Sequence, residues 1–377
     1  MKDEVRRKLD RIDELFPAER LDASKARIRA LKQNEAPVDR YPFILDSLGF
    51  NYYDDVMPAA ERLDRMLDEI IAHGMTQDDF IPQFFPGCRV ATIPDMFGAK
   101  ENIQTRADGS REYAVCDKLL SSTDDPRDLP EPVISPDSIA SFWLDMQAYV
   151  LNETEGRLPI SVIDMQGPMD VAGQLWGYDN LFLDAMDEGV KTKALLEKCT
   201  TAFIELWQRQ QDLLGDTFVG THLWGWSWVK EGSNHGASLS MDSLAMISAD
   251  FFSAHTREHL ARISEAFGGF AIHSCGDFSA VVSGITGISG IDTINSSQMS
   301  LGQLVEAGVR PDMFITIARG IDDLDKEYRL IKAHQLKVEM TISGVWPESG
   351  QHPDQWSEAE WCKFRDREHR ILELTAI

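Results

Sequence analysis

Short apolar runs alternate with longer amphipathic segments along most of this chain, and this alternation restricts its fold more than any other feature. The apolar runs predict strands at 41–48, 80–85, 158–165, 217–224, 269–273, 292–295, 313–317 and 337–342. Helix-length patterns lie between most of them, at 59–72, 137–153, 191–214, 241–267, 322–334 and 357–374. Strands that alternate with helices indicate βαβ units and a parallel sheet. About eight such repeats favour an α/β fold of the (β/α)₈ TIM-barrel type over an open doubly wound sheet.

Two segments depart from this alternation. Residues 1–35 are polar and charged, with Leu9, Ile12 and Phe16 at helical spacing, and they predict an N-terminal helical extension. Residues 102–120 contain two alternating polar–apolar runs around a turn at 107–110, which predicts a β-hairpin excursion. Neither segment carries the pattern of a second core, so we expect residues 36–377 to form a single barrel domain.

The charge of the chain excludes several classes of partner. Its formal net charge is −25, and such a surface repels nucleic acid and anionic membranes. The charged N-terminus has no signal-peptide pattern, and no apolar run is long enough to span a membrane. Five scattered cysteines without CxxC pairs are typical of reduced thiols. We therefore expect a cytoplasmic protein with a small-molecule substrate, and the acidic surface leaves room for a homodimer.

The most informative motif is His273-Ser274-Cys275-Gly276, which ends a predicted strand. Residues two apart in extended backbone point to the same side, so His273 and Cys275 can meet at one point. Imidazole and thiolate together favour Zn²⁺. In a barrel, residues at the carboxyl ends of strands form the active site. A buried cysteine beside a histidine bonded to backbone is the structural alternative.

Aromatic residues follow another predicted strand, at Trp224 and Trp226, close to His222. Such a group can form a wall for a flat or hydrophobic ligand. We expect Trp224 and Trp226 to bind substrate, and the alternative is that these side chains only cover the rim of the barrel. His222 could bind a metal, act in catalysis by polarising substrate, or cap a loop.

Polar residues lie at three further boundaries between predicted elements. Asp242 could act as a catalytic acid or base, although capping of the following helix is the commoner use of such a residue. Gln166 ends a predicted strand and is a candidate for substrate binding, in a segment that also carries the carboxylates Asp164 and Asp170. Arg319 closes a later strand, where a guanidinium suits a carboxylate group.

These segments, taken in order, resemble the uroporphyrinogen decarboxylase superfamily, and in particular its corrinoid-linked methyltransferase branch. The resemblance is carried by the helix at 25–31, by Asp39-Arg40-Tyr41-Pro42-Phe43, by Gln166-Gly167-Pro168, and by the run from Leu239 to Gly276. It covers most of residues 25–375. The resemblance implies a (β/α)₈ barrel.

The resemblance also implies a choice between two chemistries. The decarboxylases carry an arginine-rich N-terminal segment that grips porphyrinogen carboxylates, and residues 40–46 do not show it. The methyltransferases bind zinc through His-x-Cys and a late cysteine, and His273 and Cys275 match the first two ligands. Residues 342–348, at the place of the late cysteine, contain none. A third ligand would have to be His222, Glu348, Glu339 or another oxygen donor, unless the metal is absent.

We therefore expect a methyltransferase that moves a methyl group between a corrinoid, free or held by a corrinoid protein, and a small acceptor, with zinc at His273 and Cys275. One alternative is a decarboxylase or lyase that binds a small carboxylated substrate through Arg319, with Asp242 stabilising the developing charge. Another is a non-catalytic protein that binds a tetrapyrrole or corrinoid.

Overall fold

Six parallel strands form the central sheet of the computed structural model, which describes residues 2–33, 35, 39–48, 57–105, 111–221 and 236–377. The strand order is β1-β10-β9-β8-β7-β6, and every neighbouring pair is parallel. The strands are β1 (Phe43–Leu45), β6 (Ala237–Ser240), β7 (Phe270–Ser274), β8 (Ile291–Ser296), β9 (Phe314–Gly320) and β10 (Lys337–Ser343). All their carboxyl ends therefore lie at one edge of the sheet.

A second parallel pair continues this arrangement. Strand β4 (Ile160–Ser161) pairs with β5 (Phe218–Val219), and isolated parallel bridges join Phe84 to Ile160 and Gln166 to Ser240. The chain after β4 thus reaches the free edge of the six-stranded sheet at β6. The described residues show a mixed α/β fold of TIM-barrel-like character, and the closed eight-stranded barrel remains a prediction.

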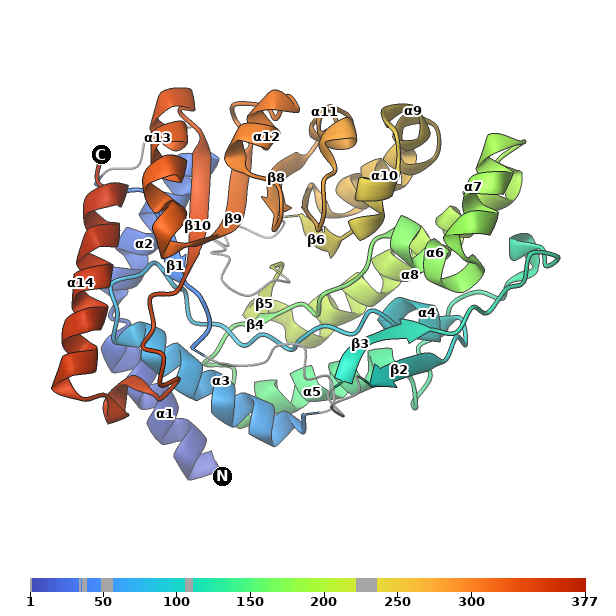
Figure 1. The fold of residues 1–377 in the computed structure, drawn as a ribbon. Coiled ribbons are helices and arrows are strands. Elements are labelled where there is room, and N and C mark those ends of the chain that lie inside the picture. The colour runs from blue at the N-terminus through green and yellow to red at the C-terminus, as the bar shows by residue number, and fades with distance from the viewer. Residues whose placement is uncertain (1, 34, 36–38, 49–56, 106–110, 222–235) are drawn as a thin grey trace.

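Helices cover the sheet, with α10 (Arg257–Phe267), α11 (Val282–Thr286), α12 (Leu301–Glu306) and α13 (Leu324–His334) along its outer side in Figure 1. The larger of the remaining helices are α3 (Ala59–Gly74), α5 (Ile139–Glu153), α6 (Pro168–Trp176), α7 (Tyr178–Met186), α8 (Val190–Leu214) and α14 (Glu358–Thr375). The shorter elements are α4 (Thr92–Met96), α9 (Ala249–Phe251), the π-helical segment η4 (Phe252–Thr256) and the 3₁₀ segments η1 (Pro126–Asp128), η2 (Gly215–Thr217), η3 (Asp242–Met246), η5 (Ser279–Val281), η6 (Ile321–Asp323) and η7 (Pro353–Gln355).

Local sequence explains where several helices begin and end. Ser300 begins α12 and Ser357 begins α14, each in a reciprocal capping box with the residue three positions on. Pro168 occupies the first turn of α6, where its missing N–H costs nothing. Gly268 ends α10 in the left-handed conformation, at φ +73°.

The N-terminal extension is helical, as the sequence predicts, and consists of α1 (Lys2–Leu15) and α2 (Ala18–Lys32). Its apolar residues Val5, Leu9, Ile12 and Phe16 belong to the main hydrophobic core. The extension therefore packs as part of the domain and has its apolar face buried.

The predicted hairpin is also present, as the antiparallel strands β2 (Glu101–Thr105) and β3 (Arg111–Cys116). Its turn at 107–110 lies outside the described residues. Figure 1 shows the pair set apart from the six-stranded sheet, and β3 contacts α6.

Several predicted elements need correction. Strand β6 was not predicted, because Ala237–Ser240 has few large apolar residues, although all four are buried. The helix predicted at 241–267 is interrupted, and its regular part begins at Arg257. Ser248 is the N-cap of α9. The π-helical segment η4 follows, and regular α-helical hydrogen bonding resumes in α10. The strands predicted at 80–85 and 158–165 are much shorter in the structure.

Among the described residues, no helix has the length and apolar character needed to cross a membrane.

Candidate functional site

The carboxyl end of β7 brings His273 and Cys275 together, as the sequence predicts. The Cys275 Sγ lies 3.3 Å from His273 Nε2. Gly276 follows with φ +78°, and a Cβ at this position would lie 2.9 Å from the Cβ of Ala245. The chain thus turns sharply at the strand end, directly after the thiol.

Asp242 is the third member of this cluster. One of its carboxylate oxygens, Oδ1, accepts a hydrogen bond from the backbone N–H of Cys275 at 2.7 Å and lies 4.0 Å from His273 Nε2. The ligand atoms of Asp242, His273 and Cys275 all lie within 4.8 Å of one another. The His273 side chain is 12% exposed and that of Asp242 is 52% exposed, so the cluster opens to solvent on the carboxylate side. We call these three residues the Asp-His-Cys cluster.

A buried carboxylate positions Asp242. Asp170, in the first turn of α6, is buried, and its two oxygens accept the backbone N–H groups of Asp242 at 2.7 Å and Ser243 at 2.9 Å. Burial raises the pKa of Asp170 to about 7. From the sequence, Asp170 could be recognised only as a strand-end carboxylate.

Asn295 contacts the other side of His273. Its Oδ1 lies 2.6 Å from His273 Nδ1, and its Nδ2 donates to the backbone oxygen and the hydroxyl of Thr316, both at 2.9 Å. These residues stand in register on three adjacent strands. The sequence analysis did not single out Asn295, although a polar residue at the end of a predicted strand is the pattern that could have identified it.

The pKa of His273 reflects opposing effects. Burial lowers it, whereas the hydrogen bond and charge of Cys275 and the contact with Asn295 raise it, with a net result of about 9. The Ser297 hydroxyl adds a hydrogen bond to Cys275 Sγ at 3.3 Å.

Gln166 is separated from His273 by one intervening strand residue, Ser240. It forms an isolated bridge with Ser240, and Ser240 stands in register with His273. The Ser240 hydroxyl donates to Asp164 at 2.7 Å. Gln166 is 9% exposed. The bridge therefore places Gln166 at the same level of the sheet as His273.

Arg319 ends β9 as predicted, but its guanidinium bonds within the protein. It donates to the backbone oxygens of Ala318 and Met299, both at 2.6 Å, and lies 3.5 Å from Glu327. The Arg319 side chain is 11% exposed. These contacts tie β9 to the chain segment before α12.

The remaining residues considered from sequence are Glu339, Glu348 and the group at 222–226. Glu339 is buried on β10, in register with Thr316. Glu348 follows β10 and is exposed. His222, Trp224 and Trp226 lie outside the described residues.

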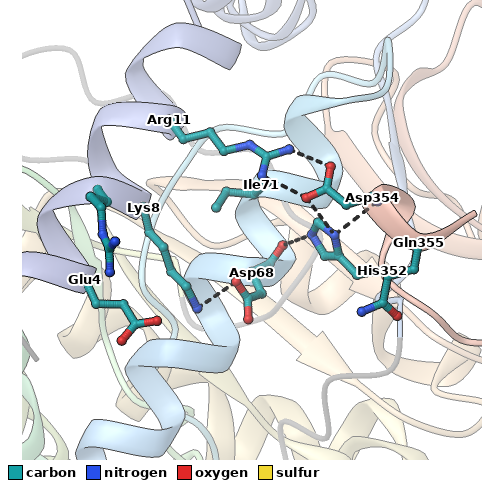
Figure 2. A pocket seen from close by; sticks show the side chains of 9 residues that line it. Glu4, Lys8, Arg11, Asp68, Ile71, His352, Asp354 and Gln355 are labelled. Atoms are coloured by element: carbon teal, nitrogen blue, oxygen red, sulfur yellow. Dashed lines mark hydrogen bonds and ion pairs between the residues drawn. The ribbon is translucent and has the colours of Figure 1, made fainter.

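A cavity of about 390 Å³ lies elsewhere, between α1, α3 and η7 (Figure 2). Charged side chains line it and pair with one another. Lys8 Nζ lies 2.7 Å from Asp68, and an Arg11 nitrogen lies 2.6 Å from Asp354. These ion pairs fasten α1 to the rest of the domain, so the cavity walls are explained by packing of the extension.

Comparisons with known proteins give the fold but no family. No protein-family profile and no curated protein sequence matches this chain. Among solved structures, a methyltransferase from Methanosarcina mazei matches with a TM-score of 0.59 and 12% sequence identity. The match covers 92% of this chain and 98% of that chain. At this identity the likeness shows a shared overall fold.

Proposed function

We propose that this chain is a methyltransferase that moves a methyl group between a corrinoid and a small acceptor, at a zinc centre formed by the Asp-His-Cys cluster. The observation that carries the proposal is the convergence of a nitrogen, a sulfur and an oxygen donor at the carboxyl edge of a parallel sheet. The fold shared with a methyltransferase is consistent with it. The corrinoid, free or held by a partner protein, comes from the sequence resemblance.

The donor set fits a catalytic zinc ion. Imidazole, thiolate and carboxylate are the protein ligands that zinc uses, and catalytic sites typically have three of them with one position open. Asp242 thus replaces the late cysteine that this sequence lacks. When bound, zinc would act as a Lewis acid that lowers the pKa of an acceptor such as a thiol.

The protein's own residues supply positioning and charge. Asp242 holds the backbone N–H of Cys275, so the thiol stays on the His273 side of the strand end. Ser297 donates to the sulfur, and Asp170 holds the start of η3 in place. Because the cluster opens to solvent at Asp242, an acceptor can approach from that side. Gln166, Trp224, Trp226 and His222 remain sequence-based candidates for substrate binding and proton transfer.

The test is methyl transfer from methylcobalamin to a small thiol, together with elemental analysis of the purified chain. We expect about one zinc per chain and a protein-dependent loss of the methyl–cobalt absorbance. The change Cys275→Ala should reduce the rate by at least about 100-fold. The matched control is Cys362→Ala, because Cys362 is an exposed cysteine on α14 and should leave the rate unchanged.

Other outcomes would identify the alternatives. Full activity without zinc would remove the metal role. Release of CO₂ from a carboxylated substrate, without a corrinoid, would indicate a decarboxylase. In that case Arg319 would have to leave its contacts with Met299 and Glu327 to bind substrate. A coloured corrinoid complex that forms equally well in Cys275→Ala, without turnover, would indicate a binding protein.

A further inference from the structure

A buried chain of hydrogen bonds crosses three adjacent strands and ends on the imidazole of His273. It runs from Thr316 on β9 through Asn295 on β8 to His273 on β7. Asn295 is 4% exposed and Thr316 is 1% exposed. Water therefore competes little for these bonds, and their donor and acceptor roles are set within the protein.

The direction of this chain follows from its first member. The backbone oxygen of Thr316 can only accept, so the atom of Asn295 that faces it at 2.9 Å must be the amide nitrogen. The amide oxygen then faces His273 Nδ1 at 2.6 Å, and a bond between them requires a proton on Nδ1. The orientation of one amide therefore decides which ring nitrogen keeps its proton.

The opposite ring nitrogen, Nε2, faces the other two residues of the Asp-His-Cys cluster. Nε2 lies 3.3 Å from Cys275 Sγ and 4.0 Å from Asp242 Oδ1. A histidine that binds metal through one nitrogen usually donates from the other to a protein acceptor, which fixes the ring orientation.

We infer that Asn295, itself oriented by Thr316, is the positioning residue that keeps the proton of His273 on Nδ1 and directs Nε2 to Cys275 and Asp242. The inference deepens the proposed function, because it rests on the Asp-His-Cys cluster as the metal centre. Asn295 touches no ligand atom other than the imidazole ring among its described contacts.

Two substitutions separate positioning from stability. In Asn295→Leu the acceptor for Nδ1–H is lost, while the side chain keeps a similar size. In Asn295→Asp one carboxylate oxygen still accepts from Nδ1–H, but the other faces the backbone oxygen of Thr316, and two acceptors repel. We therefore expect Asn295→Asp to lower the melting temperature but to keep the hydrogen bond that holds the proton on His273 Nδ1.

The first experiment measures zinc affinity of the full chain by competition with a chelator, and the melting temperature of the metal-free protein. We expect Asn295→Leu to weaken zinc binding by about 10- to 100-fold. Asn295→Asp should stay within about threefold of the wild type in affinity, in spite of its lower melting temperature. Wild-type affinity in Asn295→Leu, or equal losses of affinity in both variants, would overturn the inference.

The second experiment needs no metal. A proton held on His273 Nδ1 by Asn295 should exchange slowly and give a ¹H–¹⁵N correlation, assigned by its absence in His273→Gln. We expect this correlation in the wild type and its loss in Asn295→Leu. A wild-type ring protonated on Nε2 alone would overturn the inference. If the wild type shows the Nδ1 proton but binds no zinc, the metal centre fails and the positioning by Asn295 stands.

Discussion

At the scale of single residues, Asp242 combines two contacts in one carboxylate. Oδ1 accepts from the backbone of Cys275 and also lies near His273 Nε2, while half of the side chain is exposed. A carboxylate in this position can anchor the strand end and still offer oxygen to a cation. A substitution at Asp242 can therefore remove the negative charge while it keeps the hydrogen bond to Cys275.

The change Asp242→Asn should reveal this separation. The amide oxygen can still accept from Cys275 N–H, so the melting temperature of the metal-free protein should change by less than about 2 °C. The anionic ligand is lost, so zinc affinity should fall by at least about 10-fold. Chelator competition and thermal denaturation measure the two effects. The control Asp250→Asn removes an exposed carboxylate on α9, and its affinity should remain that of the wild type.

The residues of the site differ in how well sequence could predict them. His273 and Cys275 were predicted to converge, and they lie 3.3 Å apart, because their spacing in one strand is a local property. Asp242 was singled out as a catalytic or capping residue, but its place beside Cys275 depends on the pairing of β6 with β7 and on the buried Asp170. The contact of Asn295 with His273 depends on the register between β7 and β8, which a single sequence does not reveal.

At the scale of elements, the strands β6, β7 and β8 begin where three glycines meet. Gly269 has φ +142°, and a Cβ there would lie 2.5 Å from the backbone oxygen of Gly290. A Cβ on Gly236 would in turn lie 2.5 Å from the carbonyl carbon of Gly269. Close approach of the backbones sets the start of β7, and therefore the position of His273 at its other end.

The change Gly269→Ala should destabilise the protein by at least about 2 kcal/mol, because it adds backbone strain to a clash with Gly290. Zinc affinity should fall as well if the end of β7 shifts. Urea denaturation and chelator competition test both. The control Gly308→Ala has φ +81° with open space around the added Cβ, so it should cost only about 1 kcal/mol. Equal costs in the two variants would contradict the role of the close approach.

The prediction of elements from sequence was accurate where the pattern was long and regular. Helices α3, α5, α8, α13 and α14 begin and end within two residues of the predicted bounds. Strand β6 was missed, because only Leu239 of its four residues is large and apolar, and pairing with β7 in the sheet buries the other three. The helix predicted at 241–267 begins only at Ala249, where Ser248 caps it after the η3 segment, and the π-helical segment η4 interrupts its α-helical spacing.

At the scale of the whole molecule, buried charges join the N-terminal extension to the sheet. Asp79 has a fully buried side chain and accepts bonds from Arg27 of α2 and from Arg40, which precedes β1. Arg27 also holds Asp39 through two bonds, at 2.6 and 2.7 Å. The extension predicted at 1–35 is thus held by charge as well as by its share of the hydrophobic core.

Two carboxylates of this region have lowered pKa values. The hydrogen bonds from Arg27 hold the pKa of Asp39 at about 2. Burial alone would raise the pKa of Asp78, but His73 and Arg20 outweigh it and lower the pKa. A carboxylate with a lowered pKa contributes stability that is complete above its unfolded value, near pH 4, and is lost as the pH falls through its folded value.

Protonation of these carboxylates in acid should therefore weaken the packing of the N-terminal extension. The change Asp39→Asn should lower the free energy of unfolding by about 0.5–1 kcal/mol at pH 6, a small value because the Asp39 side chain is half exposed. This difference from the wild type should shrink between pH 4 and about 2, as Asp39 becomes protonated. Urea denaturation at several pH values, with hydrogen exchange of α2 amides, measures it. The control Asp22→Asn changes an exposed residue on α2 and should show no such difference. A difference in unfolding free energy between Asp39→Asn and the wild type that stays constant down to pH 2 would refute the role of the Arg27–Asp39 pair.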